Sequence, residues 1–292
     1  MKVVKYAAID VGSNAIRMLI ANVITFNNKT FIQKNSLVRL PVRLGHDSFT
    51  KGFISELNIT NLINAFKAFQ LLMNIHNVKE FRVYGTSALR EAKNKIEVVD
   101  RIYKKTKIRI QIIDGIKEAE VISKTNFFDL VGFYKTLLYV DVGGGSTELT
   151  IIANSKKVMS KSFKLGTVRI ISVNEKIKEW KLMKEWIEKN LKKYLKIYLL
   201  GTGGNINKLH KLTNTKEGKP ITYLILKSLY QKLSVMTYEE RIVNFGLNLD
   251  RSDVIIPAMK IYLKSLEWSG SKVIYVPQAG LTDGMIREIV NE

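Results

Sequence analysis

The fold is decided by residues 137–152, which read Leu137-Leu138-Tyr139-Val140-Asp141-Val142-Gly143-Gly144-Gly145-Ser146-Thr147-Glu148-Leu149-Thr150-Ile151-Ile152. The pattern predicts an apolar strand, a turn of three successive glycines, and a second apolar strand. Successive glycines permit positive φ angles and close approach, so backbone N–H groups can converge on one ligand oxygen. Asp141 ends the first strand and Glu148 opens the second. A phosphate-binding turn between two acids suits a divalent metal and a phosphoanhydride, whereas the alternative is a glycine hairpin with incidental acids.

The length and composition are those of a globular protein. The chain has 292 residues, so two domains are the default expectation. No apolar run reaches the ~18–20 residues of a membrane helix, and a strand pattern begins too early to leave room for a signal peptide. The absence of cysteine excludes disulfides and thiolate metal sites, and the three histidines lie far apart, which disfavours zinc. We therefore expect a cytoplasmic protein with no membrane association.

The charge is strongly basic, with 47 Lys and Arg against 26 Asp and Glu, a net charge of +21. Such a surface attracts polyanions such as nucleic acid or polyphosphate. A global lysine bias explains the same charge without a partner. No zinc-finger or RNP-type signature is present, so the sequence predicts no dedicated nucleic-acid module.

A second hairpin of the same design lies 131 residues earlier. An apolar strand over Lys5–Ile9 leads into Asp10-Val11-Gly12-Ser13-Asn14, and a further strand follows over Ala15–Val23. Glycine and asparagine tolerate left-handed backbone geometry, and serine adds a hydroxyl donor. The repeat predicts a duplicated fold whose halves each present a hairpin to one cleft.

The rest of the sequence predicts alternating helices and strands. Apolar residues recur at helical spacing from Ile59 to Met73 and indicate a buried helix face. Further strands are expected over Phe31–Val42, Phe81–Gly85, Ile108–Ile112, Tyr198–Leu200 and Val273–Val276. Further helices are expected over Ala88–Tyr103, Lys117 to about Asn126, Asn174–Lys196, Tyr223–Val235, Asp253–Leu266 and from Asp283. The glycine-rich turn Gly201–Asn205, between a strand and a helix, points N–H groups at an anion.

Two charged side chains near helix starts allow more than one interpretation. Arg90 lies beside the start of the helix after Thr86 and Ser87, where it either helps to bind an anion or is simply solvated. Glu118 lies in the first turn of its helix, where an acid commonly complements the helix dipole. The functional alternative is a carboxylate aimed across a cleft, able to take a proton from water.

Together, six segments in order resemble the exopolyphosphatase / guanosine pentaphosphate phosphatase (Ppx/GppA) family of the actin–hexokinase–chaperone ATPase superfamily. The two phosphate-binding loops of that family resemble residues 10–17 and 141–148, the second almost letter for letter. The other four resembling segments are 85–92, 114–119, 201–204 and 248–255.

The resemblance implies an α/β fold with two ribonuclease-H-like (actin-like ATPase) domains and an interdomain active-site cleft. The expected N-terminal domain spans residues 1–122 and the C-terminal one residues 123–292, with the option that the last helix packs back on the first domain. The length matches the short two-domain members, which the family associates with polyphosphate hydrolysis.

The family roles are carried over residue by residue. Glu118 is the expected general base and Arg90 the cation that neutralises the transferred group. Mg²⁺ is the expected cofactor, held by Asp141 and Glu148 with Asp10 as a further candidate. The expected phosphate-binding residues are Gly12, Ser13, Asn14, Arg17, Gly143, Gly144, Gly145, Ser146, Gly203 and Gly204. This set suits phosphoryl transfer, in which positioning and electrostatics dominate.

Four positions depart from the family pattern. Lys117 replaces the first acid of the family pair, which either lowers the charge that holds a metal or helps to grip phosphate. Ala15 removes a hydroxyl donor, Asn205 stands where Thr is common, and Thr282 lies in a final turn that lacks the frequent Arg. None removes the expected base or metal ligands, so activity is expected.

The first hypothesis is therefore a metal-dependent exopolyphosphatase that removes terminal phosphate from inorganic polyphosphate. Hydrolysis of guanosine pentaphosphate is the close alternative. An ATP-binding kinase or ATPase of the superfamily is a second class, and a non-catalytic polyphosphate- or alarmone-binding sensor is a third. A homodimer occurs in relatives, but the sequence specifies no interface.

Overall fold

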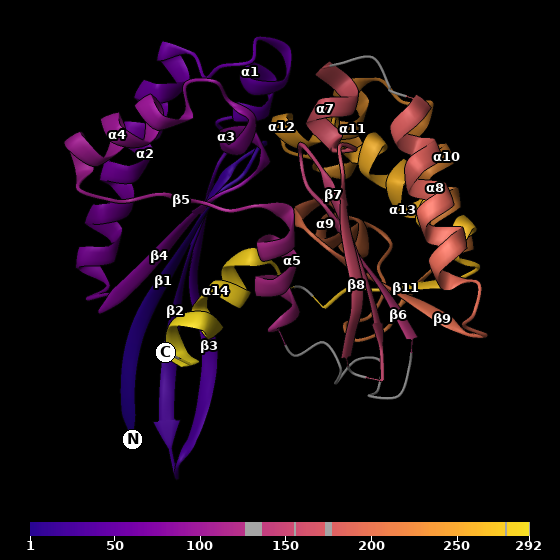
Figure 1. Cartoon of the computed structure of the whole chain (residues 1–292), viewed down its shortest axis with the longest axis horizontal. Coiled ribbons are helices and arrows are strands. Elements are labelled where there is room, and N and C mark those ends of the chain that lie inside the picture. The colour runs from indigo at the N-terminus through magenta and orange to yellow at the C-terminus, as the bar shows by residue number, and fades with distance from the viewer. Residues whose placement is uncertain (126–135, 155, 173–176, 278, 292) are drawn as a thin grey trace. The chain divides into compact units, whose positions relative to one another are not determined.

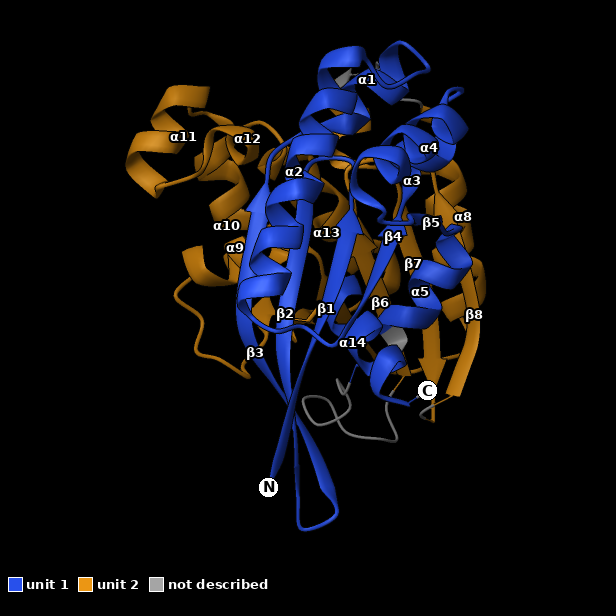
Figure 2. Cartoon of the chain, turned by 90° about the vertical axis from the view of Figure 1, so that its left-hand side faces the viewer, with its two compact units in different colours: residues 1–125, 280–292 blue, residues 126–279 orange. Residues whose placement is uncertain are grey.

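The computed structural model describes residues 1–125, 136–154, 156–172, 177–277 and 279–291. The chain divides into two compact units (Figure 2). Unit 1 comprises residues 1–125 and 280–292, and unit 2 comprises residues 126–279. Unit 1 is thus built from two separate stretches of chain, and each unit contains its own sheet.

The sheet of unit 1 has five strands. They are β1 (Lys2–Val11), β2 (Ile16–Phe26), β3 (Lys29–Leu40), β4 (Glu80–Gly85) and β5 (Gln111–Ile112). Their order across the sheet is β3-β2-β1-β4-β5. The pairs β1–β2 and β2–β3 are antiparallel, whereas β1–β4 and β4–β5 are parallel. The turn that follows β1 therefore lies at the same edge as the end of β4.

Helices cover both faces of this sheet. They are α1 (Leu44–Thr50), α2 (Glu56–Ile75), α3 (Ser87–Glu91), α4 (Lys95–Thr106), α5 (Gly115–Ser123) and α14 (Leu281–Asn291). The predicted apolar stripe of α2 is buried, and Phe66 packs edge-on against Phe69 with ring centroids 6.3 Å apart. Helix α14 packs against β1, β2, β4 and α5, so the end of the chain is part of unit 1 (Figure 1).

The sheet of unit 2 repeats this arrangement. Its strands are β6 (Thr136–Val142), β7 (Thr147–Ala153), β8 (Lys156–Phe163), β9 (Ile197–Thr202), β10 (Ile221–Thr222) and β11 (Val273–Tyr275). Their order is β8-β7-β6-β9-β11-β10. As in unit 1, three antiparallel strands are followed by two parallel neighbours, β9 and β11, and a sixth strand, β10, pairs antiparallel with β11. Both units are mixed α/β sheets of ribonuclease-H-like order, which confirms the predicted fold class.

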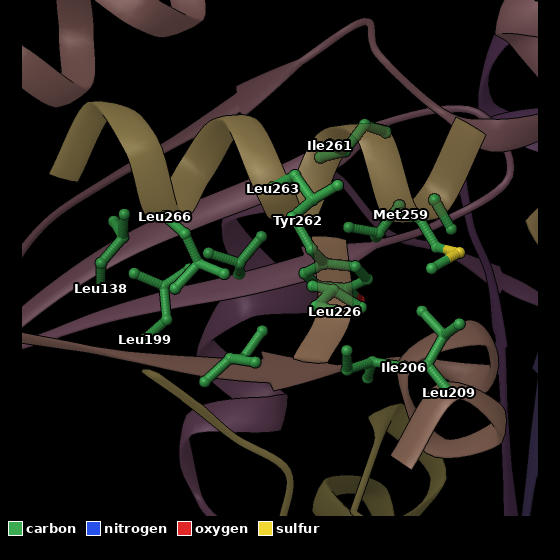
Figure 3. Close-up of a cluster of buried hydrophobic side chains, with 14 of the residues drawn as sticks. Leu138, Leu199, Ile206, Leu209, Leu226, Met259, Ile261, Tyr262, Leu263 and Leu266 are labelled. Carbon is green, nitrogen blue, oxygen red and sulfur yellow. The ribbon is translucent and has the colours of Figure 1, made fainter. Parts of the chain in front are cut away.

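The helices of unit 2 enclose a separate core. They are α7 (Thr167–Ser172), α8 (Ile177–Leu191), α9 (Gly204–Leu212), α10 (Tyr223–Ser234), α11 (Tyr238–Phe245), α12 (Leu249–Ser252) and α13 (Ile255–Ser269). Figure 3 shows side chains of α13, such as Tyr262 and Leu266, packed toward Leu138 and Leu199 of the strands. The three tryptophans pack edge-on against other rings: Trp180 against Trp268, and Trp186 against Phe163.

Two predicted elements of unit 1 are wrong in extent. The helix expected over Ala88–Tyr103 is broken at Ala92, whose ψ of 131° is extended, and it divides into α3 and α4. The strand expected over Ile108–Ile112 has only two paired residues, although Ile108 and Ile110 are buried. Asn126, the expected end of one helix, and Asn174, the expected start of another, lie outside the described residues.

Candidate functional site

The glycine turn of unit 2 is a closed four-residue hairpin. The N–H of Gly143 donates to the carbonyl of Ser146 at 3.0 Å, and Val142 pairs with Thr147 across the ladder. One step further from the turn, Asp141 lies opposite Glu148. The hairpin therefore brings two carboxylates to the same end of adjacent strands, as the sequence predicts.

The two acids are buried close together. Asp141 is 9% exposed and Glu148 is 1% exposed, and each offers a carboxylate oxygen within 4.8 Å of the other's. The hydroxyls of Ser146 and Ser162 donate to the same oxygen, Glu148 Oε1, at 2.7 and 2.9 Å. Two buried carboxylates are costly without a compensating positive charge. Carboxylate and hydroxyl oxygens are the hard donors that Mg²⁺ prefers, so this donor set fits the expected metal.

The carbonyl groups of the glycine turn are occupied by the segment that follows β8. Thr167 N donates to Gly143 O, and the N–H groups of Val168 and Arg169 donate to Gly144 O. The Arg169 side chain donates to Gly145 O at 2.7 Å. Within the described part of the chain, Gly143 is the one glycine of the three whose N–H has a backbone acceptor. The carbonyls of the turn thus point toward residues 167–169, and the described contacts include no backbone acceptor for the N–H groups of Gly144 and Gly145.

Two buried tyrosine hydroxyls of unit 2 bond to Thr202, within the electrostatic influence of Asp141. Tyr139 lies two residues before Asp141 and shares a 2.5 Å hydrogen bond with the Thr202 hydroxyl, while Tyr262 donates to Thr202 O at 2.6 Å. Burial, and next the charge of Asp141, raise the pKa of Tyr139 and of Tyr262 well above the ordinary value. Both tyrosines are therefore neutral at physiological pH, and Tyr262 donates its hydroxyl proton to Thr202 O.

The second glycine-rich turn of unit 2 lies beside the same acid. Gly203 has φ of 106°, which favours glycine, and a Cβ there would lie 3.2 Å from Asp141 Oδ1. Helix α9 begins at Gly204, and the Gly204 carbonyl accepts a 3.0 Å hydrogen bond from Arg251. The register pairs Asp141 with Thr202, so both predicted turns of unit 2 end at one edge of the sheet.

The hairpin of unit 1 has the same closure but a different charge. Gly12 N donates to Ala15 O at 3.2 Å, matching the turn of unit 2. Here Asp10 lies opposite Arg17, and the guanidinium donates to Asp10 Oδ2 at 3.0 Å. Burial raises the pKa of Asp10, and Arg17 opposes that rise. In unit 1 the cationic side chain of Arg17 therefore lies opposite Asp10, whereas in unit 2 the acid Glu148 lies opposite Asp141.

Helix α1 and the residues after β4 hold the turn of unit 1. Its carbonyls at Ser13 and Asn14 accept from Gly45 N at 2.8 Å and Arg43 N at 3.0 Å. The hydroxyl of Ser13 bonds to that of Ser87 at 2.8 Å. As in unit 2, backbone N–H groups of a neighbouring segment donate hydrogen bonds to the carbonyls of the predicted phosphate loop.

Arg90 and Glu118 are brought together within unit 1. Glu118 lies in the first turn of α5, which is capped by Asp114 through a 2.7 Å hydrogen bond from Lys117 N. Arg90, on α3, donates to Ile113 O at 2.7 Å and lies 4.0 Å from Glu118 Oε2. The hydrogen bond to Ile113 fixes the guanidinium at the start of α5. The carboxylate of Glu118 is mostly buried, at 13% side-chain exposure.

The predicted site residues divide between the units. Unit 1 contains Asp10, Gly12, Ser13, Asn14, Arg17, Arg90 and Glu118, and unit 2 contains Asp141, Gly143, Gly144, Gly145, Ser146, Glu148, Gly203 and Gly204. Sequence reasoning missed Ser162, Arg169 and Arg251. Ser162 could have been found from the hairpin register, because it pairs with Glu148 across β7 and β8.

Comparison with known proteins gives one family and several relatives. The model of the Ppx/GppA phosphatase family matches residues 28–292. A putative exopolyphosphatase of Haemophilus influenzae is 28% identical over 97% of this chain and 88% of its own length. A bifunctional 3-dehydroquinate synthase/phosphatase of Fusobacterium nucleatum is 29% identical over 97% of this chain. This chain spans only 46% of that relative.

Solved structures resemble the whole chain. An exopolyphosphatase from Cytophaga hutchinsonii has a TM-score of 0.86 at 24% identity, with 98% of each chain covered. A Ppx/GppA family member from Aquifex aeolicus has a TM-score of 0.76 at 25% identity, with 99% of each chain covered. Among the described helices, none is long and apolar enough to cross a membrane.

Proposed function

Because the chain belongs to the Ppx/GppA phosphatase family, whose members are hydrolases, we propose that it removes the terminal phosphate of inorganic polyphosphate in a metal-dependent reaction. The observation that carries this proposal is the glycine turn of unit 2, with Asp141 and Glu148 buried beside it. Its carbonyls are bound by residues 167–169, so its remaining N–H groups can receive phosphate oxygens. The relative from Haemophilus influenzae is named a putative exopolyphosphatase.

In this proposal, Glu118 is the general base. Its carboxylate takes a proton from water as the water oxygen attacks the terminal phosphorus, and the bond from that phosphorus to the bridging oxygen breaks. The products are orthophosphate and a chain shorter by one phosphate. Arg90, fixed by its hydrogen bond to Ile113 O, balances negative charge on the transferred group.

Asp141 and Glu148 would hold Mg²⁺, which when bound neutralises charge on the phosphate oxygens. Ser146 and Ser162 orient Glu148 for this role by donating to one of its oxygens. Asp10 is the further metal candidate, with its charge partly balanced by Arg17. Because the N–H of Gly12 already donates to Ala15 O, Arg17 and the N–H groups of Ser13 and Asn14 are the groups of this turn that are proposed to bind phosphate.

The direct test is phosphate release from long-chain polyphosphate with Mg²⁺, run beside Glu118→Gln. We expect release from the parent protein, its loss in EDTA, and its loss in the variant. If Glu118→Gln keeps most of the rate, the assignment of the base is wrong. If EDTA leaves the rate unchanged, the metal roles of Asp141 and Glu148 are wrong.

Guanosine pentaphosphate is the second substrate to assay. A guanosine-5'-triphosphate,3'-diphosphate pyrophosphatase of Vibrio cholerae is 24% identical over 98% of this chain and 59% of its own length. Faster release from guanosine pentaphosphate than from polyphosphate assigns that alternative. Binding without release from either substrate, unchanged in Glu118→Gln, assigns the sensor function instead.

A further inference from the structure

Helix α14 carries a buried carboxylate, Glu288, that several side chains of unit 1 surround. Glu288 is 4% exposed. Its Oε2 accepts from the hydroxyl of Tyr84 at 2.8 Å and lies 3.5 Å from Arg82. Its Oε1 accepts from Lys124 at 2.7 Å and from Lys117 at 3.1 Å. Oε2 is therefore bonded to a donor from β4, and Oε1 to one donor from α5 and one from the residue that follows it.

These partners stabilise the charged form of the carboxylate. Burial alone would raise the pKa of Glu288, but the hydrogen bonds from Lys124, Tyr84 and Lys117 lower it to about 2. A buried charge is tolerated when several donors satisfy it, and it becomes costly when one of them is removed. The cluster thus joins three elements through one side chain.

The two lysines lie on either side of Glu118, one in the first turn of α5 and one directly after its last residue. Lys117 immediately precedes Glu118, and Lys124 immediately follows the end of α5. Between them, α14 touches α5 directly, because a Cβ at Gly284 would lie 2.1 Å from Val121 O. Three contacts along nearly two turns restrict both the rotation of α5 about its axis and its movement along that axis.

We propose that Glu288 is a positioning residue for Glu118, which acts by anchoring α5 to α14 and β4 through Lys117, Lys124 and Tyr84. The part that concerns catalysis rests on the proposed function of Glu118 as the base. A base must lie within hydrogen-bond reach of the water that it deprotonates, and an error of about 1 Å can cost on the order of 100-fold in rate. Glu288 supplies that precision without touching substrate.

The same contacts explain the lysine that departs from the family pattern. The ammonium of Lys117 lies 3.1 Å from Glu288 and 3.1 Å from Glu120, so its charge is bound by two carboxylates. The sequence offered two interpretations, a weaker metal site or a grip on phosphate. The geometry points to a third role, as the anchor of the helix that carries Glu118.

The test compares Glu288→Gln with a matched control, Glu267→Gln. Glu267 also accepts from a tyrosine, Tyr223, at 2.8 Å and from a lysine, Lys264, at 2.7 Å, but it lies at the end of α13 in unit 2. Steady-state rates on polyphosphate are normalised to the folded fraction from circular dichroism. Hydrogen exchange of the amides in residues 118–122 is measured in parallel without substrate.

For Glu288→Gln we expect kcat to fall by about 10- to 100-fold, with KM for polyphosphate and half-saturating Mg²⁺ unchanged within twofold. The amides of α5 should exchange faster than in the parent. Glu267→Gln should leave both readouts as in the parent. If Glu288→Gln does not fold, Lys117→Met, which leaves Lys124 and Tyr84 on Glu288, provides the same comparison.

The outcomes separate the two proposals. Unchanged exchange in α5 overturns the anchoring role, whatever the activity. Faster exchange with an unchanged kcat overturns the positioning role, as does a rise in KM that matches the loss of kcat. A parent protein that releases no phosphate refutes the proposed function, and the exchange measurement then decides the anchoring of α5 by itself.

Discussion

The packing of Gly166 against the glycine turn of unit 2 gives a sharp prediction for Gly166→Ala. A Cβ at Gly166 would lie 2.3 Å from Gly145 C, and 2.4 Å from both Gly144 O and Gly145 N. All three atoms are backbone, so no side chain can move aside. Ordinary contact begins at 3.4 Å, so the glycine turn or the chain before α7 must move by roughly 1 Å.

The expected effect on catalysis is large. Such overpacking costs about 1–3 kcal/mol of stability, and a shift of roughly 1 Å in a phosphate-binding turn costs on the order of 100-fold in rate. That loss corresponds to about 2.7 kcal/mol of activation free energy. The assay is kcat and KM for polyphosphate, with the unfolding temperature followed by circular dichroism.

A matched control separates the clash from the substitution itself. Gly280→Ala adds the same methyl group where no atom lies within 4 Å and φ is not positive. We expect it to keep the parent rate within twofold. If Gly166→Ala, once folded, also keeps the parent rate, the turn at residues 143–146 does not bind the reacting phosphate.

Three further predictions concern the metal ligand, the buried cluster and the surface charge. Ser162→Ala removes one donor to Glu148 and should raise the half-saturating Mg²⁺ concentration about tenfold. Ser160→Ala is the control, because the Ser160 hydroxyl bonds to Thr150 instead, and it should leave that concentration unchanged. Equal shifts in both variants refute the role of Ser162 in orienting Glu148. Because the pKa of Glu288 is lowered from 4.5 to about 2, its stabilisation is present above pH 4.5 and is lost as the pH falls toward 2. In urea unfolding, the stability difference between the parent and Glu288→Gln should therefore shrink over that window, and a constant difference contradicts the assignment. In unit 2, one cavity of about 340 Å³ is lined by Lys189, Lys192 and Lys193, which form no ion pair among the described residues. Replacing these three lysines by glutamine should therefore lower the slope of log Kd for polyphosphate against log salt by about 2. An equal change on replacing Lys67, Lys104 and Lys105 of unit 1 contradicts a local polyanion-binding surface.

Local sequence pattern predicts the hairpins well. An apolar strand that ends in an acid, followed by glycine and small polar residues, specifies a tight turn at residues 12–15 and 143–146. The two-residue period of the strands then determines which side chains share a face. For this reason the pairing of Asp141 with Glu148 could be predicted from the sequence, and it is found.

Contacts between distant segments could not be predicted in this way. Helical spacing of apolar residues continues through residues 88–103, yet the helix is interrupted at Ala92 because of contacts with the segment that precedes α2. The side chain of Asn94 makes two 2.9 Å hydrogen bonds with the backbone of Ile54, and Lys93 N donates to Gly52 O. These contacts favour the break over a continuous helix, and no local propensity reveals them.

The anchoring of α5 belongs to the same class. Glu288 and Lys117 are 171 residues apart, and nothing in either local pattern indicates that they meet. A glutamate near the end of a helix and a lysine in the first turn of another both look like solvated charges. The pattern near Glu118 thus identifies the helix and its cap, but not what holds it in place.

The discontinuity of unit 1 also constrains the order in which the protein is made. Its two stretches, residues 1–125 and 280–292, are separated by the whole of unit 2. Ribosomes add roughly 5–20 residues per second, so residues 126–279 take on the order of ten seconds to emerge. During that time Tyr84, Lys117 and Lys124 lack their shared partner, Glu288, which has not yet been synthesised. Unit 2 is continuous in sequence and can fold before α14 is synthesised. The usual order of domain completion during translation is therefore reversed: the N-terminal unit is the last to close.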